Sequence, residues 1–167
     1  MANLKEVDLY KQKIIETLLS DEIVVQLLTN DPSHDVPAKD LVYVQVFPYD
    51  WMDVTSLTAQ AYICLDIDIV GMKSNYAVKD CVMTVWVMCH QQAMSLRGTD
   101  NYDLSYTGGT LRDKLADRID YLLNGHKDFG FGKVELSRAP RFDPGGRYYG
   151  RELIYSVQDY NRTPQKL

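Results

Sequence analysis

Two stretches of period-two alternation constrain the fold of this chain more than any other feature. In residues 59–71 the apolar residues that share one face are Ala61, Ile63, Leu65, Ile67 and Ile69. Residues 76–91 repeat the pattern with Cys81, Met83, Val85, Val87 and Cys89. Successive side chains of a strand point to opposite faces, so both stretches are predicted to be half-buried strands. The short polar segment between them predicts an antiparallel hairpin.

Helical periodicity precedes and follows these strands. Asn3 and Glu6 have the spacing of a capping box, and apolar residues then recur at helical spacing as far as Leu18. Ser20-Asp21-Glu22 predicts the start of a second, short helix that ends near Asn30. Thr110 is a candidate cap for a third helix, which the Asn124-Gly125 pair ends.

The remaining regular segments are also extended. Residues 41–49 are β-branched and aromatic, and Pro48 suits a strand end or a sheet edge. Residues 131–139 and 151–160 flank an Asp-Pro-Gly-Gly turn and predict a hairpin. The simplest architecture is an α+β fold: a mixed or antiparallel sheet of about five strands, two main helices packed on one face, and an extended C-terminal hairpin.

The length of 167 residues favours a single domain spanning 1–167. Within it we expect an extended hairpin arm at 138–151 and a flexible tail at 162–167. No stretch approaches the roughly 20 consecutive apolar residues of a membrane span, and the charged N-terminal segment does not have the apolar core of a signal peptide. We therefore expect the protein in the cytosol of the cell that makes it. The three cysteines lie in apolar strand-like runs and are expected to be buried free thiols.

Charge is distributed unevenly along the chain. The net charge of −5 argues against a general nucleic-acid binder, whose affinity depends on neutralising phosphates. Residues 138–151 hold four arginines and one aspartate, which makes this segment +3 and leaves −8 on the other residues. The residues of this arm with interface character are Arg138, Arg141, Arg147, Tyr148, Tyr149 and Arg151. Arginine and tyrosine are enriched where proteins meet other proteins.

Three interpretations of the arm remain open. It is a solvated hairpin tip, a contact for DNA phosphates, or a bridge to the acidic surface of an identical neighbour. The last would be a contact between two different surfaces, and repeated contacts of that kind close into a ring when the rotation allows.

Candidate chemistry elsewhere is sparse. His34, His90 and His126 lie far apart in the sequence, and Cys89 and His90 point to opposite faces of a strand, so neither a metal site nor a cofactor is predicted. Asp66 and Asp68 share a strand face and could serve acid–base or Mg²⁺ chemistry, although a solvated face or an interface explains them as well. The glycine pair before Thr110 lacks the context of a phosphate-binding loop. We predict that the protein is not an enzyme, with a small α+β enzyme using Asp66 and Asp68 as the alternative of another class.

The order of elements resembles that of a known family. A leading helical region ending in "IIETLLSDEIVVQLL", an "FPYDW" segment among three strands, a helix "LRDKLADRIDYLLNG" and a final hairpin are similar to the tail terminator and related neck proteins of long-tailed bacteriophages. The resemblance implies a virion protein, assembled in the host cytoplasm, that forms a hexameric ring. Such a ring caps the tail tube and joins it to the head connector, so the implied partners are further copies, the tail tube protein and the connector or adaptor protein.

The resemblance also implies a channel through which DNA passes without specific binding. An acidic wall repels phosphates, and the candidates for such a wall or for an interface are Asp50, Asp53, Asp66 and Asp68. A head-closure or adaptor protein and a minor tail protein are the alternatives within the same class.

Overall fold

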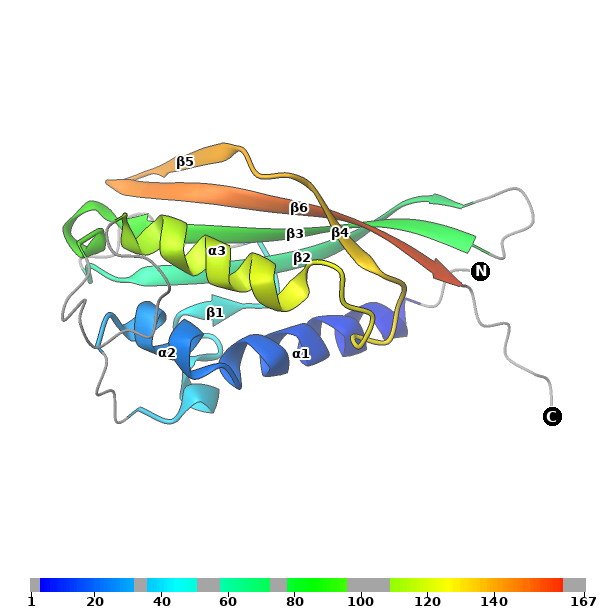
Figure 1. Ribbon diagram of the computed structural model, residues 1–167, viewed down its shortest axis with the longest axis horizontal. Helices are drawn as coiled ribbons and strands as arrows, with labels where there is room; N and C mark the ends of the chain where they lie inside the picture. Colours follow the sequence, from blue (N-terminus) through cyan, green and yellow to red (C-terminus); the bar gives the residue numbers. More distant parts are fainter. Residues whose placement is uncertain (1–3, 32–35, 51–57, 73–77, 96–108, 161–167) are drawn as a thin grey trace.

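The computed structural model describes residues 4–31, 36–50, 58–72, 78–95 and 109–160. Its helices and strands, shown in Figure 1, are α1 (Lys5–Leu19), α2 (Glu22–Thr29), the 3-10 helix η1 (Ala38–Leu41), β1 (Val46–Phe47), β2 (Ala61–Met72), β3 (Val78–His90), the 3-10 helix η2 (Gln91–Ala93), α3 (Leu111–Leu123), β4 (Val134–Arg138), β5 (Arg141–Gly145) and β6 (Tyr148–Tyr160). The predicted α+β class, with a mixed sheet and a C-terminal hairpin, is confirmed. None of the described helices is long and apolar enough to span a membrane.

The six strands form one sheet in the order β1-β2-β3-β6-β4, with β5 paired to β6. β1 runs parallel to β2, and all other pairs are antiparallel. The predicted hairpin of β2 and β3 is confirmed from the pair Ala61 and Cys89 to the pair Met72 and Lys79. β1 therefore lies at one edge of the sheet, and β4 and β5 lie at the other (Figure 1).

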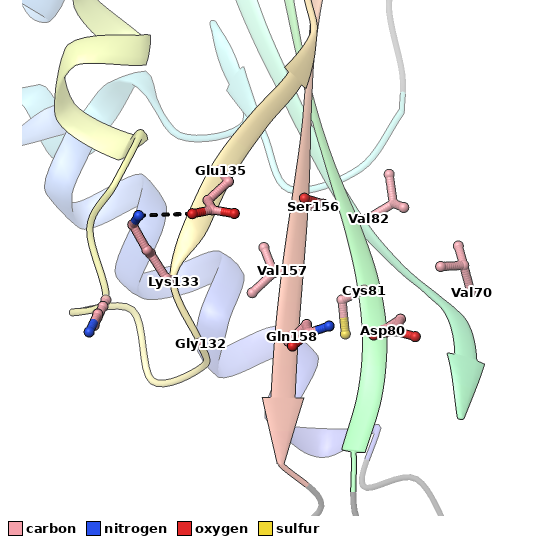
Figure 2. A pocket seen from close by; sticks show the side chains of 11 residues that line it. Val70, Asp80, Cys81, Val82, Gly132, Lys133, Glu135, Ser156, Val157 and Gln158 are labelled. Atoms are coloured by element: carbon pink, nitrogen blue, oxygen red, sulfur yellow. Dashed lines mark hydrogen bonds and ion pairs between the residues drawn. The ribbon is translucent and has the colours of Figure 1, made fainter. Parts of the chain in front are cut away.

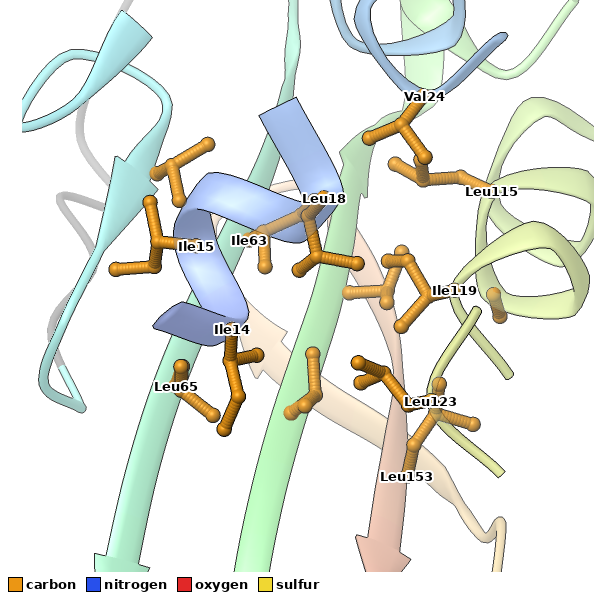
Figure 3. Packing of buried hydrophobic residues seen from close by; sticks show 14 of the residues in the cluster. Ile14, Ile15, Leu18, Val24, Ile63, Leu65, Leu115, Ile119, Leu123 and Leu153 are labelled. Carbon is orange, nitrogen blue, oxygen red and sulfur yellow. The ribbon is translucent and has the colours of Figure 1, made fainter. Parts of the chain in front are cut away.

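The helices cover one face of this sheet, and the main core lies between them. Figure 3 shows Ile14 and Leu18 of α1 beside β2 and β3, and Ile119 and Leu123 of α3 on the side of β3 and β6, all in one apolar layer over the sheet. The strand residues that meet them are the odd-numbered apolar residues predicted from the alternation, such as Ile63. Burial of each large aliphatic side chain contributes about 1.5–3 kcal/mol, so this layer holds the helices on the sheet.

Two of the three predicted helix starts are confirmed. The Asp21 side chain accepts a hydrogen bond from Val24 N, and the Thr110 side chain accepts one from Asp113 N. α1 differs, because its N-cap is Leu4 and no side chain caps it, while Asn3 lies outside the described residues. Glu6, predicted to belong to a capping box, instead accepts a hydrogen bond from the Tyr10 hydroxyl.

The opposite face of the sheet is apolar only at one end. There a second cluster forms from Phe47, Tyr62, Cys64, Met88 and Tyr148. The alternation predicted that Tyr62 and Cys64 would lie on a solvated face, and this was wrong at this end of β2. The reason is that rings from β1 and β6, distant in sequence, pack over these side chains; the Tyr62 and Tyr148 centroids are 5.8 Å apart.

Residues 41–49 form much less strand than predicted. Only Val46–Phe47 pair with β2, because η1 continues to Leu41 and Tyr43 has a left-handed backbone with φ of 62°. Pro48 directly follows β1 at the sheet edge, which agrees with the place predicted for it.

The C-terminal hairpin turns at residues 145–148. Gly145 pairs with Tyr148, and both residues between them, Gly146 and Arg147, have positive φ, as a type I′ turn requires. β6 then lies between β3 on one side and β4 and β5 on the other. The predicted arm is thus β5, its turn and the first residues of an interior strand.

Candidate interaction surfaces

The face of the sheet turned away from the helices, here called the open face, is rich in carboxylates. No helix of the described segments covers it (Figure 1). Its acidic residues, from four neighbouring strands, are Asp66, Asp68, Asp80, Glu135 and Glu152. Among the described residues of these four strands, the cationic side chain on the open face is Arg138, which lies opposite Ile154 at the β4 edge.

The carboxylates of the open face differ in how they are paired. Asp66 Oδ1 lies 2.6 Å from the Nζ of Lys11, which reaches it from α1. Glu135 is held by Lys133 at 2.8 Å, and the exposed position of this pair makes it a weak contact. Glu152 accepts a hydrogen bond from the Trp86 indole. Asp68 is exposed and no partner for it occurs among the described residues, so the open face keeps negative charge.

The other two acidic candidates lie elsewhere. Asp50 is exposed beyond β1, at the edge of the sheet. Asp53 lies outside the described residues. The sequence offered Asp66 and Asp68, or Asp50 and Asp53, as candidates for an acidic wall or interface, and the structure brings Asp66 and Asp68 to the same face of β2.

A shallow groove of about 750 Å³ lies at the far end of the open face. Figure 2 shows Val70, Asp80, Val82 and Ser156 around it, with Lys133 joined to Glu135 at its rim. Neither Asp66 nor Asp68 lines this groove. The enzyme alternative required Asp66 and Asp68 to lie together in a pocket, and this groove does not contain either carboxylate.

Other candidate groups are engaged within the fold. His90 accepts a hydrogen bond from Gln92 N and packs edge-on against Tyr148. All three cysteines are free and buried, and burial raises the pKa of Cys89 to about 12, so this thiol is inert at neutral pH. In the described part of the chain, no three His, Cys, Asp or Glu side chains are arranged to hold a metal ion.

The basic hairpin presents some of its predicted residues and buries others. Arg138, Arg141, Arg147 and Tyr149 are exposed. Arg141 makes one exposed contact, 3.5 Å from Asp143. Tyr148 instead lies in the second apolar cluster, where its hydroxyl donates to the Thr58 carbonyl.

Arg151 connects the hairpin to α3. Its Nη2 lies 3.1 Å from Asp113 Oδ1, and its Nη1 donates to the Ala139 carbonyl. Partial burial alone would raise the pKa of Asp113, but hydrogen bonds from Arg112, Thr110 and Arg151 outweigh it and lower that pKa. Tyr148 and Arg151 therefore position the hairpin, and its exposed residues are the ones open to a partner.

Sequence reasoning missed a second groove at the opposite edge of the sheet. This Tyr43 groove, of about 550 Å³, lies between α1 and residues 42–48, and its lining includes Asp8, Ile15, Glu16, Val42, Tyr43 and Pro48. Tyr43 is 64% exposed and its ring lies 6.4 Å from that of Tyr49. The sequence feature that could have indicated this groove is the tyrosine and valine content of residues 42–48, but the same residues favour a strand equally well.

Comparisons with known proteins connect the chain with a protein family and, more distantly, with a solved structure. The family model YomW matches residues 21–157. A chain in a solved structure described as "Virion of native gene transfer agent (GTA) particle" is 15% identical, with a TM-score of 0.46 over 83% of this chain and 92% of that chain. No curated protein sequence matches the chain.

Proposed function

This chain belongs to YomW, a phage-derived family, and from this premise we propose that it is a structural protein of a phage or phage-like particle. In this proposal it acts in the virion, after assembly in the host cytoplasm, and catalyses no reaction. It forms a ring, of six copies by the family resemblance, at the head-proximal end of the tail. There it terminates the tail tube and joins the tube to the head connector.

The acidic open face is the observation that carries this proposal. A channel for DNA must not bind phosphates, because each neutralised phosphate adds affinity and slows passage. A wall that presents Asp68 and Asp80 from adjoining strands, beside the Asp66 that Lys11 pairs, repels the DNA backbone along this part of the sheet. The groove on the same face does not bring Asp66 and Asp68 together, as the enzyme alternative requires.

Opposite charges at the two sheet edges support assembly of the ring. Arg138 and Arg141 lie on the β4 and β5 edge, whereas Asp50 follows β1 at the other. One copy can therefore place its basic edge against the acidic edge of the next, and the contact repeats around a closed ring.

Localisation in purified particles tests the proposal. We would purify particles from cells that express an epitope-tagged chain, detect the chain by mass spectrometry, and label it with gold for electron microscopy. The expected result is label at one point, where tail meets head, and separate heads and tails when the gene is deleted. Label along the tail or at its far tip would contradict the terminator role, and label on the head side of the joint would favour a head-closure or adaptor protein.

A test of the open face uses charge reversal. Asp68→Lys with Asp80→Lys should leave particles assembled but lower the fraction that delivers DNA, because the channel would then attract phosphates. Lys133→Met, at the exposed end of the same sheet, is the matched control and should change delivery little. Normal DNA delivery by the double variant would show that the open face does not line the channel.

A further inference from the structure

Two bulky exposed residues have left-handed backbone conformations. Among the described residues, the non-glycine residues with positive φ are Asn30, Tyr43 and Arg147. Asn30 is explained locally, because it is the left-handed C-cap of α2. Tyr43 at φ 62° and Arg147 at φ 69° occupy positions where glycine or asparagine is preferred. A side chain kept at such a position, without burial to justify it, indicates a role outside the isolated chain.

Tyr43 is held rigidly in its turn. The Gln45 side chain, which is buried, donates from Nε2 to the carbonyls of Leu28 and Ala61 and so ties the turn to α2 and to β2. Within the turn, Tyr43 N donates to the Val46 carbonyl. The backbone that carries the exposed Tyr43 ring is therefore fixed, and little backbone entropy is lost when a partner binds the ring.

The Tyr43 groove is negatively charged at its rim. Asp8 and Glu16 are exposed along one side of it, on α1. Lys11 also lines the groove, but its ammonium group already contacts Asp66 at 2.6 Å and the Pro48 carbonyl at 3.1 Å. The groove thus combines an apolar floor, an aromatic wall and unneutralised carboxylates, which suits the aliphatic stem and the guanidinium of an arginine.

Arg147 has the complementary properties. It lies at the tip of the turn between β5 and β6, it is exposed, and no partner for its side chain occurs within the described part of the chain. Its own chain cannot bring it to the Tyr43 groove, because the groove lies at the β1 edge and the turn at the β5 edge (Figure 1). A second copy, however, can bring its turn to this groove.

We propose that Arg147 of one copy binds in the Tyr43 groove of the next copy, stacked on the Tyr43 ring and paired with Asp8 and Glu16. This inference rests on the proposed function, since it identifies the two surfaces that join neighbouring subunits of the ring. The contact is between different surfaces, so each copy donates one arginine and accepts one, as closed rings require.

Cross-linking in the assembled particle tests this contact. Val44 and Tyr149 are exposed neighbours of Tyr43 and Arg147, and the native cysteines are buried. We would first detect the wild-type chain in particles by mass spectrometry, and then treat particles carrying Val44→Cys and Tyr149→Cys with a short bis-maleimide. The contact predicts a ladder of cross-linked copies in the double variant and monomers in each single variant.

The charge requirement is tested in the same background. Arg147→Glu should reduce the ladder at least tenfold, while Lys127→Glu, the same charge change at an exposed lysine outside the Tyr43 groove and the turn, should leave it unchanged. Particles that contain the chain but give no ladder, or a ladder that survives Arg147→Glu, would overturn this contact and leave the proposed function standing. Cross-linked dimers in a single variant would also overturn it, because they indicate a symmetric contact. Absence of the wild-type chain from particles would overturn the proposed function and this contact together.

Discussion

Lys79 offers the clearest test of what holds α1 on the sheet. Its side chain is 1% exposed, on the helix-covered face of β3. Its Nζ lies 2.9 Å from Asp159 Oδ2 at the end of β6, and 3.2 Å from Glu6 Oε2 in α1. The Tyr10 hydroxyl donates to both carboxylates. We therefore predict that Lys79→Met, which keeps the apolar stem and removes the charge, strongly destabilises the fold.

The magnitude follows from the burial of the partners. Removing one member of a buried ion pair costs about 3–5 kcal/mol, because the other charge stays buried and unpaired. The side chain of Asp159 is 8% exposed and that of Glu6 is 19% exposed, so Glu6 regains water more easily. We expect a loss near the lower limit, about 3 kcal/mol, and a fall in Tm of roughly 6–12 °C for a chain of this size.

Equilibrium unfolding in urea, followed by circular dichroism, measures this loss. Lys133→Met is the matched control, because its Nζ also lies 2.8 Å from a carboxylate but the two side chains are 50% and 59% exposed; its stability should change by less than about 0.5 kcal/mol. Adding Asp159→Leu to Lys79→Met should restore part of the loss by removing a stranded charge. Equal urea midpoints for the two lysine variants would refute the reasoning.

Three further predictions concern helix capping, alkaline pH and the hairpin turn. Asp21→Ala should lower stability by about 1–2 kcal/mol in thermal unfolding at pH 7. Burial alone would raise the pKa of Asp21, but the hydrogen bonds to its carboxylate outweigh burial and lower that pKa. The stabilisation by Asp21 is therefore lost as pH falls, and the variant should differ less from the wild type at low pH. Burial and hydrogen bonds to carboxylates raise the pKa values of Tyr10 and Tyr155. Above about pH 10 the unfolded chain therefore loses these protons first, and the free energy of unfolding should fall as pH rises. Urea titrations at several pH values should show a smaller fall in this free energy for Tyr155→Phe. Arg147→Gly should raise Tm by up to about 4 °C by relieving a left-handed arginine, while Arg138→Gly should not.

The elements predicted well are those whose signals are local. β2 and β3 follow from alternation, and the starts of α2 and α3 follow from Asp21 and Thr110, whose side chains accept hydrogen bonds from backbone three residues ahead. Such contacts depend on sequence spacing alone, so no knowledge of the rest of the fold is needed.

The residues predicted poorly depend on neighbours distant in sequence. Tyr62 alternates as a solvated residue should, yet it is buried because Tyr148 packs on it. Lys79 lies in the polar first residues of β3, before the strand becomes apolar. Its ammonium group is buried because it pairs with Glu6 and Asp159, which are 73 and 80 positions away in the sequence. The interface prediction for Tyr148 had the same weakness, because composition does not distinguish a ring that binds a partner from one that packs internally.

The failure at residues 41–49 has a different cause, because local preference itself is contradicted there. These residues favour a strand, yet only Val46 and Phe47 form one, while Tyr43 adopts a conformation that costs an ordinary residue about 1–2 kcal/mol. Arg147 contradicts its local preference in the same way at the other edge of the sheet. Natural sequences are locally consistent except where function requires otherwise. Two such exceptions lie at opposite edges of the sheet, one an aromatic ring in an acidic groove and the other a cation, and a repeating contact between copies would select this combination.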